Sequence, residues 1–248
     1  MDLSLPTAPE HFTTEWLNEH MVVPGAGEGA KIIACRSRAS TTPGQTAEIA
    51  LLTVQWDRDD AELPTRLIAK YTSQNPQVIA EVVNVFDQYR RETGFYRDFS
   101  APGIGVARCF FQCHQPDHQA VVLILEDLGP SESPSWGISE AQVGMALAQL
   151  PAFHARWWNQ PILRQKECFV QHDDPVFFAL GFGAAAQISE GLRTWFDDPA
   201  LTQTLMPIVA EKQSEMQALY ASRPFTLVHG DYHAKQIFFP SSAGGRFA

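Results

Sequence analysis

The periodicity of the apolar residues changes near residue 129, and this change limits the folds open to the chain. Before it, five short apolar runs of period two or of continuous apolar character predict strands at residues 31–36, 47–56, 66–71, 106–114 and 119–126. After it, apolar residues recur at steps of three and four and predict helices at residues 139–158, 174–195 and 199–222. This segregation predicts an α+β fold of two lobes, residues 1–126 and 127–248, joined by a hinge near residues 126–129.

One long helix is predicted among the strands. Asn75 is a natural N-cap and Pro76 suits the first helical position. Apolar residues then follow at steps of three, four or seven: Val78, Val82, Val85, Tyr89, Tyr96 and Phe99. We therefore expect the first lobe to hold a five-stranded antiparallel sheet with a helix over residues 76–99 against it.

Two opposite charges stand at apolar positions of this lobe. Glu92 falls on the apolar stripe of the predicted helix, where an unpaired carboxylate would cost several kcal/mol. Lys70 lies in the strand RLIAKY, whose alternation places Leu67, Ala69 and Tyr71 on the other face. One interpretation is a lysine that contacts nucleotide phosphates and a glutamate that holds it. The other is an edge-strand lysine that extends to solvent and a glutamate at the border of the stripe.

A dense polar loop lies near the C-terminus, in LVHGDYHAKQIFFP. His229, Asp231 and Gln236 fit the pattern H-x-D-x-x-x-x-Q between predicted strands at residues 226–228 and 237–239. A kinase loop of this spacing carries an Asp that accepts the proton of the acceptor hydroxyl and an amide that binds Mg²⁺. Alternatively, the loop is a polar turn in which His229 hydrogen-bonds the backbone.

Several segments together resemble one family. RLIAKY, RRETGFYRDF, AVVLILEDLG, ALAQLPAFHARWW and LVHGDYHAKQIFF occur in the order found in the superfamily of aminoglycoside phosphotransferases, choline kinases and ecdysteroid-kinase-like proteins. The resemblance spans about residues 30–240 and implies a two-lobed protein-kinase-like fold. It also implies transfer of the γ-phosphate of ATP to a hydroxyl of a small molecule, with Mg²⁺.

The resemblance assigns roles to individual residues. In the catalytic loop, residues 229–236, Asp231 would be the catalytic base, Gln236 would bind Mg²⁺, and His229 and His233 would support the loop. The nucleotide would be bound in the first lobe by Lys70, Glu92, Glu126, Asp127 and Leu128, the last three through hinge backbone groups near adenine.

The chain departs from the family pattern in three places. Gln236 stands where the family has Asn, and SRASTTPGQT, residues 37–46, is not a glycine-rich G-x-G-x-x-G loop. In the family, a strand after the catalytic loop carries an Asp that binds Mg²⁺. Here residues 241–245 resemble the preceding hairpin and the sequence ends at Ala248. We therefore expect this chain to be catalytically weak or inactive, or to be a kinase-fold protein that binds a nucleotide or small molecule without catalysis.

Composition excludes some partners. The chain has 18 basic and 28 acidic residues and a net charge of −10, which disfavours nucleic acid. Residues 1–29 have no signal-peptide pattern, and no apolar run is long enough to span a membrane. We expect a cytoplasmic protein whose partner is a small hydroxylated acceptor; the oligomeric state is not predicted.

Two metal-site alternatives have weaker support. Cys109, Cys113, His114 and His118 have a spacing open to zinc, although strand alternation also explains it. Asp231 and His233 form the D-x-H of binuclear metallophosphoesterases, but the downstream ligand segments of those enzymes are missing.

Overall fold

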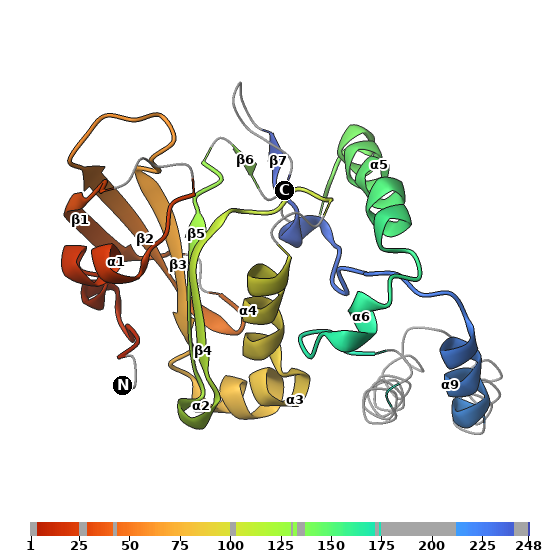
Figure 1. Ribbon diagram of the computed structural model, residues 1–248. Helices are drawn as coiled ribbons and strands as arrows, with labels where there is room; N and C mark the ends of the chain where they lie inside the picture. Colours follow the sequence, from red (N-terminus) through yellow and green to blue (C-terminus); the bar gives the residue numbers. More distant parts are fainter. Residues whose placement is uncertain are drawn as a thin grey trace. The chain divides into compact units, whose positions relative to one another are not determined.

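A computed structural model describes residues 4–24, 29–41, 44–99, 103–129, 131–132, 137–171, 174, 212–240 and 248 (Figure 1). The chain forms two compact units, Met1–Phe153 with His229–Ala248, and His154–Val228. The lobe boundary expected at residue 126 stays a prediction.

The first unit contains one large sheet. Its strands are β1 (Ile32–Ala39), β2 (Ala47–Trp56), β3 (Arg66–Thr72), β4 (Cys109–Gln115) and β5 (Ala120–Glu126), in the order β1-β2-β3-β5-β4. All neighbouring strands are antiparallel. A short 3-10 turn, η3 (Pro116–His118), joins β4 to β5. The five-stranded antiparallel sheet and the α+β class are thus confirmed.

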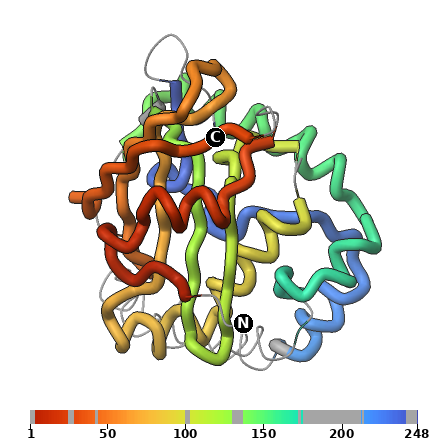
Figure 2. Tube along the Cα trace, turned by 60° about the vertical axis from the view of Figure 1, so that its left-hand side comes forward, coloured from red at the N-terminus to blue at the C-terminus, as the bar shows by residue number. Residues whose placement is uncertain are grey.

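Both faces of the sheet pack against other segments, the first face along β3 and the second face in part. Leu67, Ala69 and Tyr71 are buried on the first face, in a cluster with Phe12 and Leu17. The latter two come from the segment of η1 (Pro9–His11) and α1 (Thr14–His20), and α1 crosses in front of the strands in Figure 2. The opposite face packs against the helical segment that follows β3.

The interior strand β5 is buried on both faces. Val121 and Leu123 pack against Tyr89 of this helical segment, while Val122 and Ile124 belong to the first-face cluster. Double burial explains why AVVLILE is a continuous apolar run and does not alternate.

The prediction of one continuous helix over residues 76–99 is wrong. The segment is divided into α2 (Pro76–Val78), a π-helical turn η2 (Ile79–Val83), α3 (Asn84–Phe86) and α4 (Gln88–Asp98). Asp87 lies between α3 and α4 in the left-handed region, with φ 49°. A π-turn and a left-handed residue both rotate the following face, so one stripe cannot continue through the segment. Val85 is accordingly 43% exposed, whereas Val83 is 3% exposed.

The remainder of the first unit centres on α5 (Glu140–Trp157), whose residues to Phe153 belong to it. The predicted capping box is present, since Gln142 N donates to Ser139 Oγ (3.3 Å) and Ser139 N donates to Gln142 Oε1 (2.9 Å). A two-stranded sheet pairs β6 (Ser131–Glu132) with β7 (Phe239–Pro240). Phe238 also exchanges two backbone hydrogen bonds with Ala248, at 2.7 and 3.1 Å.

The second unit is described in part, by α6 (Ile162–Gln165) and α9 (Gln213–Ser222). Asn159 donates its backbone N–H to Phe225 O (2.8 Å) and accepts from Phe225 N through Oδ1 (2.9 Å). Residues 226–228, predicted as a strand, have no strand pairing, and Thr226 Oγ1 donates to His154 O instead (2.8 Å). The predicted helix 174–195 and the start of 199–222 lie outside the described residues.

Candidate functional site

The lysine and the glutamate singled out from the sequence form an ion pair. Lys70 lies in β3 between Ile49 of β2 and Leu123 of β5, and its Nζ donates to Oε1 of Glu92 on α4. The two side chains are 24% and 34% exposed, so water still reaches the pair. The pairing of Lys70 with Glu92 is therefore present, and contact of Lys70 with nucleotide phosphates stays a prediction.

Glu92 lies beside two buried ionisable groups. Burial raises the pKa of Tyr96 well above its usual value, and the negative charge of Glu92 adds to that effect. Burial also raises the pKa of the Cys109 thiol to about 12, again with a contribution from Glu92. Both groups therefore stay neutral at physiological pH, and Lys70 provides the counter-charge for the carboxylate.

Tyr89 fixes α4 to the sheet one turn before Glu92. Its side chain is buried, its Oη donates to Thr46 O (2.8 Å), and it accepts from Ser73 N (3.0 Å). Thr46 directly precedes β2 and Ser73 directly follows β3. The phenol thus joins the ends of two strands to the helix that carries Glu92. Sequence reasoning placed Tyr89 on the apolar stripe and missed this role, because a hydroxyl's partners are not encoded in the local pattern.

The loop at residues 229–236 forms a second cluster. Gly230 has φ 83°, and Asp231 N donates to His229 Nδ1 (3.3 Å). Gln236 Nε2 donates to Asp231 Oδ2 (3.2 Å), and His233 Nε2 lies 3.4 Å from the same oxygen. Since a carboxylate only accepts, the amide must present its NH₂ group to Asp231, which leaves Gln236 Oε1 as the atom that a cation can approach.

His233 holds the turn that follows Asp231. Its Nδ1 accepts from Lys235 N (3.3 Å) and caps η4 (Ala234–Gln236), so the neutral ring carries its proton on Nε2, toward Asp231. Tyr232 fixes the loop to α5, since its Oη donates to Ala146 O (3.0 Å). Asp231 itself is 64% exposed and open to a reactant. His229 and His233 therefore have the supporting contacts expected of them.

Two of the three hinge residues, Glu126 and Asp127, have contacts that fix their side chains. Glu126 exchanges backbone and carboxylate contacts with Arg108, whose N donates to Oε2 (3.0 Å) and whose O accepts from Glu126 N (2.8 Å). Asp127 accepts from Arg66 Nη2 (2.7 Å) and from Gly129 N (2.9 Å). The N–H of Glu126 is thus already used by Arg108 O. The adenine contacts expected of the backbone of Glu126, Asp127 and Leu128 stay a prediction.

The donors expected for Mg²⁺ fit a hard cation in type. Gln236 Oε1 and the Asp231 carboxylate are oxygen donors, which Mg²⁺ prefers together with waters and substrate phosphates. Among the residues that the structure describes, no group of three or more His, Cys, Asp or Glu is placed to hold a metal ion. For the zinc alternative, Cys109 Sγ donates instead to Phe111 O (3.1 Å) and His114 packs edge-on to Tyr89.

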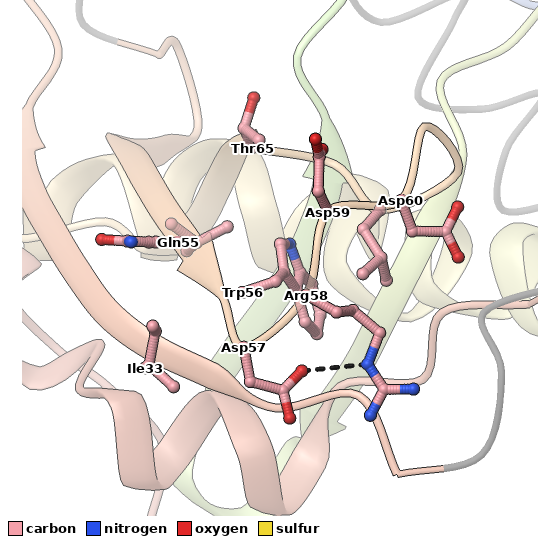
Figure 3. Close-up of a pocket in the computed structure, with 10 residues that line it drawn as sticks. Ile33, Gln55, Trp56, Asp57, Arg58, Asp59, Asp60 and Thr65 are labelled. Atoms are coloured by element: carbon pink, nitrogen blue, oxygen red, sulfur yellow. Dashed lines mark hydrogen bonds and ion pairs between the residues drawn. The ribbon is translucent and has the colours of Figure 1, made fainter.

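A separate hollow of about 460 Å³ lies at the turn between β2 and β3 (Figure 3). Its lining includes Ile33, Trp56 and the ion pair of Asp57 with Arg58 Nε (3.1 Å). None of the residues predicted for the site lines it.

Comparison with models of known protein families, with curated proteins and with solved structures gives no match. Among the described helices, none is both long and apolar enough to cross a bilayer.

Proposed function

We propose that the chain has a protein-kinase-like fold and is a phosphotransferase, with the weak activity expected from its sequence, that moves the γ-phosphate of ATP to a hydroxyl of a small molecule. One observation carries the proposal: the ion pair between Lys70 and Glu92, two residues 22 apart in sequence, one in a central strand and one on the helix packed against the sheet. A structural ion pair alone would not need a second polar cluster, but the loop at residues 229–236 supplies the groups that such a transfer requires.

The proposed division of labour follows from the contacts. Lys70, oriented by Glu92, binds phosphate oxygens of the nucleotide. Asp231 accepts the proton of the acceptor hydroxyl, whose oxygen forms a bond to the γ-phosphorus while the bond to the β–γ bridging oxygen breaks and ADP leaves. Gln236 orients Asp231 through its NH₂ group. Gln236 Oε1 would hold Mg²⁺, which supplies charge neutralisation of the phosphates when bound.

The second candidate is a kinase-fold protein that binds a nucleotide or small molecule without phosphoryl transfer. It is favoured by Gln236, because its side chain is one methylene longer than the expected Asn and Mg²⁺ demands near-ideal octahedral geometry.

Binding and turnover of ATP distinguish the two candidates. The full chain is first titrated with ATP and Mg²⁺ by calorimetry, and then assayed for ADP release with a panel of hydroxylated acceptors. A phosphotransferase binds ATP and releases ADP only with an acceptor; D231N abolishes release and keeps binding, whereas K70M weakens binding. Binding without release supports the second candidate. No ATP binding by the wild-type chain refutes the phosphotransferase and leaves of the second candidate only the binding of another small molecule.

A further inference from the structure

The half of the second sheet face farthest from α4 is open. Helix α4 packs on β4 and β5, at one side of the sheet. On β2 and β3, the side chains of this face are half-buried at Ile49, Leu51 and Ile68 and exposed at Thr53. Side chains of the opposite face of the same strands are fully buried, as at Leu52. This region is therefore an apolar strip that solvent reaches.

The strand register places an arginine of β1 beside this strip, on the same face as Lys70. Arg38 is opposite Leu51, and Leu51 is opposite Ile68. Lys70 is opposite Ile49, two residues along β2 from Leu51. With strands ~4.8 Å apart and ~3.3 Å per residue, the Cα atoms of Arg38 and Lys70 are about 12 Å apart. Two long cationic side chains at this separation can contact one ligand of the size of a triphosphate.

The arginines of β1 have exposed side chains. In the described part of the chain, neither the Arg36 nor the Arg38 side chain has a hydrogen-bond or ion-pair partner. Lys70 and Arg66, on the same face, are paired with Glu92 and Asp127. A chain with 28 acidic and 18 basic residues has carboxylates in excess, so two unpaired arginines two residues apart on one open strand face need an explanation.

We propose that Arg38, together with Lys70, binds the phosphate chain of a nucleoside triphosphate. A guanidinium presents parallel N–H donors that match phosphate oxygens in pairs, which a backbone loop would otherwise supply. Residues 37–46 lack the glycine-rich pattern of such a loop, and Arg38 replaces it as the source of donors. The proposal rests on the proposed function for the identity of the ligand as a nucleotide, but the anion site depends only on Arg38 and Lys70.

The test is calorimetric titration of the full chain with three probes: ATP, inorganic tripolyphosphate and adenosine. The variants are R38Q, R38K and K70Q, with R58Q as a matched control. Arg58 is also an exposed arginine, but it lies in the β2–β3 turn and is paired with Asp57. We expect R38Q to weaken binding of ATP and of tripolyphosphate about tenfold, the usual effect of losing one charge-assisted hydrogen bond. R38K should lose less, and R58Q and adenosine binding should not change.

The outcomes separate this proposal from the proposed function. If R38Q binds both anions as the wild type does while K70Q does not, Arg38 is not a phosphate ligand and the proposed function stands. If the wild type binds tripolyphosphate through Arg38 but not ATP, the anion site stands and the kinase proposal fails. If the wild type binds neither anion, both are refuted.

Discussion

Replacing Tyr89 by Phe should loosen α4 from the sheet without opening a cavity. The ring remains, but its hydroxyl loses one donated and one accepted hydrogen bond, to Thr46 O (2.8 Å) and from Ser73 N (3.0 Å). Ser73 is 8% exposed and Tyr89 4%, so water does not readily replace the phenol at the Ser73 N–H. An unsatisfied buried donor costs roughly 1–3 kcal/mol. Thr46 is half-buried and its carbonyl can bind water, so we expect a total cost of about 2 kcal/mol.

Amide hydrogen exchange measures this cost at the affected group. A loss of about 2 kcal/mol corresponds to roughly 30-fold faster exchange of the Ser73 N–H. The matched control is Y71F. Tyr71 is equally buried, at 4%, on the opposite face of the same sheet, and its hydroxyl has no hydrogen-bond partner within the described residues. Unchanged exchange at Ser73 in Y89F, or an equal effect in Y71F, would refute the reasoning.

Three further predictions concern groups whose environment the structure defines. With a pKa of about 12, Cys109 should be alkylated at pH 8 about a thousandfold more slowly than an unfolded thiol, as followed by peptide mass spectrometry; rapid labelling of the folded chain would contradict this burial. Burial lowers the pKa of His114, with Arg90 adding to and Asp87 opposing the effect, so the unfolded chain binds the extra proton first. Stability should therefore fall as the pH drops below roughly 6.5, and the fall in thermal midpoint between pH 7.5 and 5.5 should be smaller in H114Q. S139A removes the capping-box hydroxyl of α5 and should cost about 1 kcal/mol in urea unfolding, whereas S139T should cost less; equal losses would show that the cap contributes nothing.

The sequence pattern was sufficient to predict an element where buried and exposed residues alternate regularly along it. The predicted bounds of β2, residues 47–56, match the structure, because its alternation reflects one face packed on a core. The pairing of Lys70 with Glu92 was one of two interpretations of the sequence, and it rested on two opposite charges at apolar positions. The capping box at Ser139 is encoded within four residues and needs no tertiary contact.

Local pattern failed where a predicted strand needs a partner strand. Residues 226–228 have a strand-like composition, yet Thr226 donates to His154 O, a contact with a residue 72 positions away. Strand pairing needs a partner edge, and the composition of a short run does not say whether one is available.

The sequence by itself predicted the five strands of the large sheet and indicated Lys70 as a candidate partner of Glu92, because these depend on side-chain chemistry at fixed spacing. Only the tertiary structure decided that the helical segment after β3 breaks at Asp87, that Tyr89 fixes α4 to two strand ends, and that Arg38 shares the face of Lys70. The strand register depends on pairing between segments that are distant in sequence. The π-turn and the left-handed residue change the direction of the side chains that follow them. The periodicity of apolar residues within one segment predicts neither.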